Sequence, residues 1–68
     1  MNLQIEIDKE EDGRWIAEII SLPGVMAYGQ TRQKAITNVK VLALQTLASR
    51  IANGEDVPEI LDVFAVMS

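Results

Sequence analysis

Every second side chain is apolar at the start of the chain. Over residues 2–8, Leu3, Ile5 and Ile7 alternate with polar or acidic residues. This period of two predicts a strand with one buried and one solvated face. The polar segment that follows ends in Asp12-Gly13, which is a strong signal for a β-hairpin when strand patterns flank it.

The returning antiparallel strand is predicted over residues 14–20, and it also has two distinct faces. Trp15, Ala17 and Ile19 share one face, and Ile16, Glu18 and Ile20 share the other. Leu22-Pro23-Gly24 then predicts a type II turn, because proline presets φ at the second turn position and glycine supplies the positive φ required next. A third short strand is predicted over residues 25–29, which completes a three-stranded meander.

A long helix is predicted over residues 32–52. Thr31 is suited to the N-cap position, and Asn53-Gly54 with Pro58 beyond it is typical of a helix C-terminus. At about 1.5 Å per residue the helix is roughly 30 Å long. Strands of six residues span only about 20 Å, so we expect part of the helix to overhang the sheet.

A final strand is predicted over residues 60–66, because this segment is rich in β-branched and aromatic side chains and contains a single charge. The expected fold is therefore α+β, with the order β-β-β-α-β in a single domain over residues 1–68. We expect the last strand to return to the sheet and the helix to cover one sheet face.

Apolar residues lie on two faces of the predicted helix. The broader stripe has the width expected for packing on a sheet, and it contains Ala35, Ile36, Val39, Leu42, Ala43 and Leu47. The second stripe lies on the far side and consists of Val41, Leu44, Ala48 and Ile51, spaced as in a helix–helix seam. Monomers seldom expose a large apolar strip, so we expect an oligomer interface here. The alternative is that the last strand or a loop covers this stripe.

Composition narrows the classes of function. The chain has 68 residues, 49% of them hydrophobic, and neither cysteine nor histidine. Disulfides and ordinary zinc or haem ligation are therefore ruled out as supports for a small core. A domain of this size buries only about 60% of its unfolded surface, so self-association is the expected supplement. We predict no cofactor, no metal and no catalytic residue.

The formal net charge is −4, with acids concentrated near both ends of the sequence. A net acidic surface repels phosphate, so we expect no direct nucleic-acid binding, and it suits a basic partner. The sequence shows no basic-then-apolar leader and no apolar run of about 20 residues. We therefore expect a soluble cytoplasmic protein without a membrane segment.

Three acids are the strongest candidates for a site. Glu6, Asp8 and Glu18 share one predicted sheet face, where they could form an acidic binding surface or, less simply, hold two Mg²⁺ ions for a nuclease reaction. We favour the binding surface, since exposed acids on the wet side of a sheet are common. The segment 8–13 resembles the start of a calcium loop, but Ile19 occupies the position of its closing Glu, so a solvated hairpin tip is expected.

The chain carries a set of short motifs, which are Asp12-Gly13, Trp15, Ala17, Leu22-Pro23-Gly24, Gly29 with Thr31 two residues later, and Ala35. In these motifs the chain resembles the HicB-like antitoxin family. From the residues alone, Trp15 is expected in the core, and Gly24 and Gly29 are expected to serve the backbone. The resemblance implies a partial ribonuclease-H-like domain that dimerises and caps a small basic ribonuclease toxin by occlusion. Family members usually append a DNA-binding module, which we do not expect here.

The chain departs from the family in the first turn of the helix, where Arg32 and Lys34 replace the usual acids. We favour a tolerated solvated turn over a contact with an acidic surface on another chain. The leading hypothesis is a homo-oligomer, dimer or tetramer, that binds a basic protein through its acidic face or an edge strand. The alternatives are a stand-alone module that binds a small ligand or acts as a scaffold, and a metal-dependent nuclease.

Overall fold

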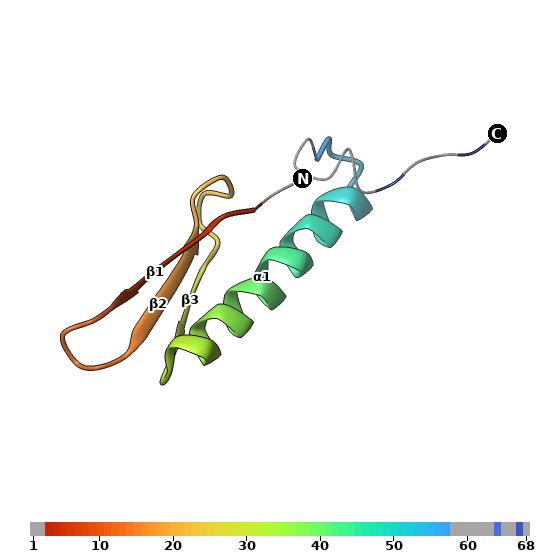
Figure 1. The fold of residues 1–68 in the computed structure, drawn as a ribbon. Helices are drawn as coiled ribbons and strands as arrows, with labels where there is room; N and C mark the ends of the chain where they lie inside the picture. Colours follow the sequence, from red (N-terminus) through yellow and green to blue (C-terminus); the bar gives the residue numbers. More distant parts are fainter. Residues whose placement is uncertain (1–2, 58–63, 65–66, 68) are drawn as a thin grey trace.

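A computed structural model of the protein describes residues 3–57, 64 and 67. Three antiparallel strands are followed by one helix (Figure 1): β1 (Ile5–Lys9), β2 (Trp15–Ile19), β3 (Met26–Gly29) and α1 (Arg32–Ala52). The strands lie in the order β1-β2-β3, as a meander. The predicted α+β fold of three strands and a helix is confirmed. The strand predicted over 60–66 lies outside the described residues, except for Phe64, whose side chain is exposed.

The strand ends differ from the prediction by one to three residues. Strand β1 begins at Ile5 and not at residue 2, because Ile5 pairs with Ile19, the last residue of β2. Strand β2 ends there because the Leu22 N–H donates to the Ile19 carbonyl at 3.0 Å and starts a turn. At the other end, β1 extends to Lys9, which pairs with Trp15.

Both connecting turns have the predicted chemistry. Gly13, at φ +93°, donates its N–H to the Glu10 carbonyl at 3.0 Å, so the hairpin loop ends in a left-handed glycine. In the second turn, Gly24 has φ +88° and the Val25 N–H donates to the Leu22 carbonyl at 3.0 Å. This is the type II turn predicted from Pro23-Gly24.

The helix begins and ends at the predicted residues. The Thr31 side chain caps α1 by accepting a hydrogen bond from the Lys34 N–H at 3.0 Å. At the other end, the N–H groups of Gly54 and Glu55 donate to the carbonyls of Ile51 and Arg50, each at 3.0 Å. With Gly54 at φ +77°, these two bonds form a Schellman motif.

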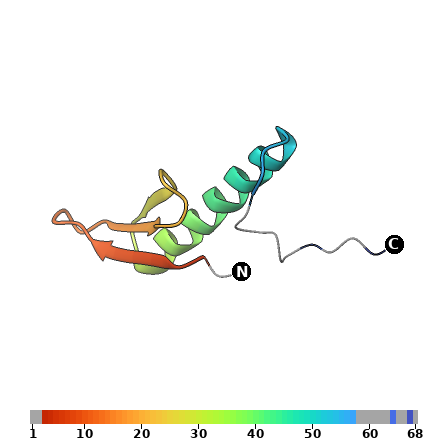
Figure 2. The same cartoon turned by 90° about the horizontal axis from the view of Figure 1, so that it is seen from above.

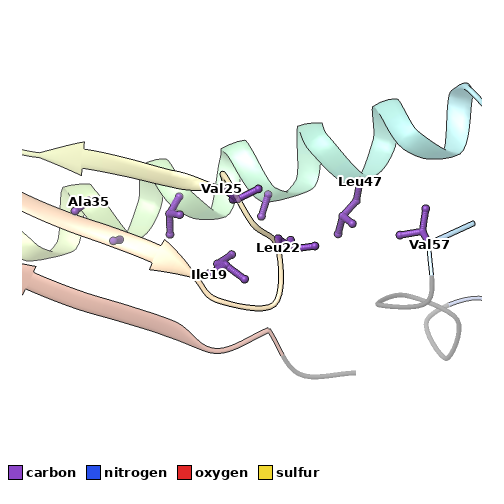
Figure 3. Close-up of a cluster of buried hydrophobic side chains, with 9 residues drawn as sticks. Ile19, Leu22, Val25, Ala35, Leu47 and Val57 are labelled. Atoms are coloured by element: carbon purple, nitrogen blue, oxygen red, sulfur yellow. The ribbon is translucent and has the colours of Figure 1, made fainter. Parts of the chain in front are cut away.

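The core lies between α1 and one face of the sheet. Every fourth helix residue from Ala35 to Leu47 points into it, and the type II turn adds Leu22 and Val25 (Figure 3). The buried cluster comprises Ala17, Ile19, Leu22, Val25, Ala35, Val39, Ala43, Leu47 and Val57. Trp15, predicted as a core residue, is only half-buried, because it stands at the end of β2 where only the first part of α1 lies above the sheet.

The first turns of α1 are held close to β3. A Cβ atom placed on Gly29 would lie 2.3 Å from the Ala35 nitrogen, so glycine is needed here for close approach and not for its φ. One turn later, the Asn38 side-chain amide donates to the Tyr28 carbonyl at 2.8 Å. The remaining length of α1 extends past the strands, as its length predicts (Figures 1 and 2).

Gly29→Ala should destabilise the protein by about 1–3 kcal/mol, because the added methyl group must push α1 away from β3. Urea unfolding followed by far-UV circular dichroism measures this change. Gln30→Ala, at an exposed neighbour, should change stability by no more than about 0.5 kcal/mol. Equal midpoints for the two variants would contradict the close approach.

Candidate protein-binding surfaces

Helix α1 covers one face of the sheet (Figure 1). Alternate side chains of the strands point to the opposite face. We call this second surface the open face. Its side chains come from alternate positions of the three strands: Glu6, Asp8, Ile16, Glu18, Met26 and Tyr28, continued beyond the strand ends by Arg14 and Ile20.

The three acids predicted to share a sheet face do so. Glu6 lies directly opposite Glu18 in the β1–β2 pairing, and Asp8 lies one pair further along, opposite Ile16. These residues and Ile7 line an open hollow of about 410 Å³. Among the described residues, no group of three or more acidic, histidine or cysteine side chains is placed to hold a metal ion.

The Glu6–Glu18 pair brings two side chains of like charge together. Like charges directly opposite one another on a sheet repel, because their Cβ atoms lie only about 5 Å apart. Within residues 3–57, no lysine or arginine forms an ion pair with either carboxylate. We therefore expect this pair, with Glu6 exposed and Glu18 half-buried, to lower stability slightly.

Exposed apolar side chains lie beside the acids. Ile20, Met26 and Tyr28 are 55%, 42% and 43% exposed, and Ile16 is half-buried between the acids and Tyr28. Sequence reasoning did not single out Met26 or Tyr28 as part of this surface. The alternation along residues 25–28 could have indicated their orientation, because Val25 and Ala27 point inward and Met26 and Tyr28 outward. All four residues are apolar, so hydrophobicity alone does not show which face each occupies.

Arg14 lies at one corner of the open face. Its guanidinium carbon lies 4.4 Å from the Tyr28 ring centroid, and its Nε donates to Asp12 Oδ2 at 2.7 Å. The Arg14 backbone N–H also donates to Asp12 Oδ1 at 3.1 Å. This backbone bond, followed by the side-chain bond and charge of Arg14, holds the pKa of Asp12 below its ordinary value.

A separate apolar surface lies on α1. In the second stripe, Val41, Leu44 and Ile51 are 49%, 67% and 48% exposed, and Ala48 is also exposed. The structure thus places these four residues away from the core, as the helical spacing predicts. Leu44 also lines a cavity of about 220 Å³ between α1 and β1, together with Leu3, Ile5, Ile19, Lys40 and Ala43.

The cations at the start of α1 are both exposed. Lys34 lines a groove of about 260 Å³ with Arg14, Tyr28, Gly29, Gln30 and Asn38. Arg32 lies in the same first turn, where positive charge opposes the helix dipole. A solvated turn and a contact with an acidic surface are both compatible with this exposure, so the predicted solvated role stays a prediction.

The chain is similar to a protein of Thermoplasma acidophilum named UPF0150 protein Ta0767. The two are 29% identical over 58 residues, which cover 85% of this chain and 84% of that protein. No protein-family model matches the chain, and no solved structure matches it. No helix in the described part of the chain has the length and apolarity needed to cross a membrane.

Glu18→Gln should raise the free energy of unfolding by about 0.2–1 kcal/mol at neutral pH, because it removes the repulsion from Glu6. The gain should shrink at high salt, which screens exposed charges. Urea unfolding at low and high ionic strength tests this. Glu11→Gln, at the exposed hairpin tip, is the matched control and should leave stability nearly unchanged. A loss of stability in Glu18→Gln would contradict the prediction.

Arg14→Ala should raise the pKa of Asp12 only part of the way to its ordinary value, because the backbone N–H of residue 14 remains. A carboxyl pKa that is lowered in the folded state stabilises the fold above the unfolded-state pKa. That contribution is lost as the pH falls through the folded-state pKa. Titration of the carboxyl carbon by NMR measures the shift, and Arg32→Ala should leave it unchanged. An unaltered Asp12 titration in Arg14→Ala would refute the role of the guanidinium.

Proposed function

We propose that the protein is a non-catalytic binding module of the HicB-like antitoxin type, which uses its open face to cover a small basic ribonuclease toxin. Two similarities support this proposal. The motifs from Asp12-Gly13 to Ala35 resemble that family, and the Thermoplasma relative bears the name of UPF0150, a family of the HicB-like antitoxin type.

One observation on the open face supports it most directly. Glu6 and Glu18 lie opposite one another, with Asp8 beside them, and like charges in this position are expected to lower stability. Sites that sacrifice stability in this way are typical of functional surfaces, where activity and stability trade against each other. A lysine or arginine from a partner would relieve the repulsion, so the unfavourable pair in the free protein becomes a favourable one in the complex.

The apolar side chains of the open face would hold the basic partner that its acids attract. Complementary charge accelerates encounter, whereas buried apolar and aromatic anchors slow dissociation. Met26 and Tyr28 lie next to the acids across β2 and are half-exposed in the free protein. A partner that suits both parts has a row of cations beside an apolar ridge. Inhibition then follows from covering the partner's surface and requires no chemistry from this chain.

The experiment compares two double variants with equal change of charge. Glu6→Gln with Glu18→Gln removes the opposed acids, and Glu11→Gln with Asp56→Asn removes two exposed acids elsewhere. The genome is first searched for a neighbouring gene that encodes a small basic protein. Each variant is then titrated with that purified protein, and titration calorimetry measures the affinity. The first should weaken binding about tenfold or more, and the second should have little effect beyond screening.

The same variants test toxin neutralisation through cell growth. The Glu6–Glu18 variant should fail to rescue growth when the basic protein is expressed, although we expect its fold to be at least as stable. Equal affinity for both double variants would refute the open face as the binding surface. Absence of any association between the unmodified chain and its basic neighbour would refute the antitoxin function itself.

A further inference from the structure

We propose that Asn53, the C-cap residue of α1, is a site of spontaneous deamidation, and that its conversion to isoaspartate breaks the cap and releases the end of the helix. The reaction uses only water and hydroxide, so it does not depend on what the open face binds and goes beyond the proposed function. Three features of the helix end support it: an exposed Asn-Gly pair, a side-chain amide that the fold does not hold, and a cap that the product cannot keep.

An asparagine followed by glycine can form a succinimide ring through the main chain. The Gly54 nitrogen loses its proton to hydroxide and attacks the Cγ atom of Asn53. A bond forms between these two atoms, the Cγ–Nδ2 bond breaks, and the side-chain nitrogen takes a proton from water and leaves as ammonia. Glycine favours the attack because it has no side chain to shield the nitrogen, and asparagine is chemically labile on heating.

Water then opens the ring and gives one of two products. Its OH group adds to a ring carbonyl carbon, and its remaining proton goes to the Gly54 nitrogen as the bond between that nitrogen and carbon breaks. Cleavage at Cγ gives aspartate with the normal main chain. Cleavage at the original main-chain carbonyl leaves the chain running through Cγ, which is isoaspartate.

Asn53 is exposed, and within residues 3–57 its side-chain amide forms no hydrogen bond. Asn38 differs in both respects that matter. Its side-chain amide donates to the Tyr28 carbonyl at 2.8 Å, and the residue after it is Val39, which is buried and β-branched. The fold therefore leaves Asn53 open to the reaction and protects Asn38.

The pair Asp12-Gly13 could form the same ring, but the hairpin protects it. Both carboxylate oxygens of Asp12 are held by Arg14, through its backbone N–H at 3.1 Å and its Nε at 2.7 Å. The backbone bond, followed by the side chain of Arg14, keeps the pKa of Asp12 low. An ionised carboxylate resists attack because it offers no good leaving group. Of these two pairs, only Asn53-Gly54 should react at neutral or alkaline pH.

The cap decides when the ring can close. The Gly54 N–H donates to the Ile51 carbonyl at 3.0 Å, so the folded helix end holds the proton that must be lost. Helix ends fray, and local opening of this kind needs far less free energy than global unfolding. Opening of the last turn therefore controls the rate of deamidation, and the rest of the fold can stay intact.

Isoaspartate cannot restore the cap. Its main chain is lengthened by a methylene group just before Gly54, so the two N–H groups that form the Schellman motif no longer reach their carbonyls. The product also has a new negative charge at the C-terminus of α1, next to Glu55 and Asp56. Negative charge is unfavourable there because it opposes the helix dipole.

Loss of the cap extends to the core through Val57. The turn at Gly54 brings the chain back, and the buried side chain of Val57 lies toward Leu47 (Figure 3). A lengthened main chain moves Val57 out of this position, and the last turns of α1 lose their cover. Ammonia is lost to solvent, so the change runs in one direction, and older copies of the protein accumulate the released form.

Incubation of the folded protein at alkaline pH tests the site. Peptide mass spectrometry locates each deamidated residue, and fragmentation of the main chain distinguishes isoaspartate from aspartate. Asn53 should convert about tenfold faster than Asn38 or more, because a helix end opens more readily than the middle of a packed helix. The rate should rise in proportion to the hydroxide concentration. Asn53→Gln, whose longer side chain closes a ring far more slowly, is the matched control and should not age.

Hydrogen exchange of the aged protein tests the effect on the cap. Protection of the Gly54 and Glu55 amides should fall about tenfold or more, because each loses its carbonyl partner, whereas the Gly13 amide in the hairpin should keep its protection. Asn53→Asp introduces the new charge without the added methylene group. Its amides should keep more protection than those of the isoaspartate form, which separates the effect of charge from that of chain length.

Several outcomes would overturn the proposal. Equal conversion of Asn53 and Asn38, or faster conversion of Asp12 than of Asn53, would refute the site. Ageing of Asn53→Gln at the rate of the unmodified chain would refute the succinimide route. Unchanged protection of Gly54 and Glu55 in the isoaspartate form would refute release of the helix end.

Discussion

Two layers built from one helix and three strands constrain everything else in this protein. Each layer can bury only one side against the other. The core consequently consists of one row of helix residues, from Ala35 to Leu47, packed on one face of the sheet and closed at the turn by Leu22 and Val25. The opposite side of each layer must face outward, and both outward sides carry apolar residues. In the described part of the chain, no third layer covers either the open face or the second stripe.

The two outward surfaces differ in chemistry. The open face combines opposed acids with Met26 and Tyr28, which agrees with the basic partner proposed above. The second stripe carries four exposed apolar residues and no charge.

Features set by local chemistry could be predicted from the sequence. The bounds of α1, the glycine at the end of the hairpin loop and the type II turn all depend on a few neighbouring residues, and each is as predicted. Strand ends could not be predicted as well, because the pairing partner decides where a ladder stops. The half-buried position of Trp15 and the part played by Met26 and Tyr28 required the register of the sheet and the placement of the helix above it. The grouping of Glu6, Asp8 and Glu18 followed from alternation alone, whereas the direct opposition of Glu6 and Glu18 did not.

The bond between Asn38 and Tyr28 has a consequence for aggregation. The Ile19 N–H donates to the Val25 carbonyl at 3.1 Å, and this sets the phase of the β2–β3 ladder so that the Tyr28 carbonyl points outward from the sheet. The Asn38 side-chain amide donates a hydrogen bond to that carbonyl, so a strand added beside β3 would have to displace Asn38. On β1, the Lys9 N–H is likewise bonded to the Asp8 side chain, at 2.8 Å. A strand added at either border would have to displace a side chain, which makes edge-to-edge pairing and aggregation less favourable.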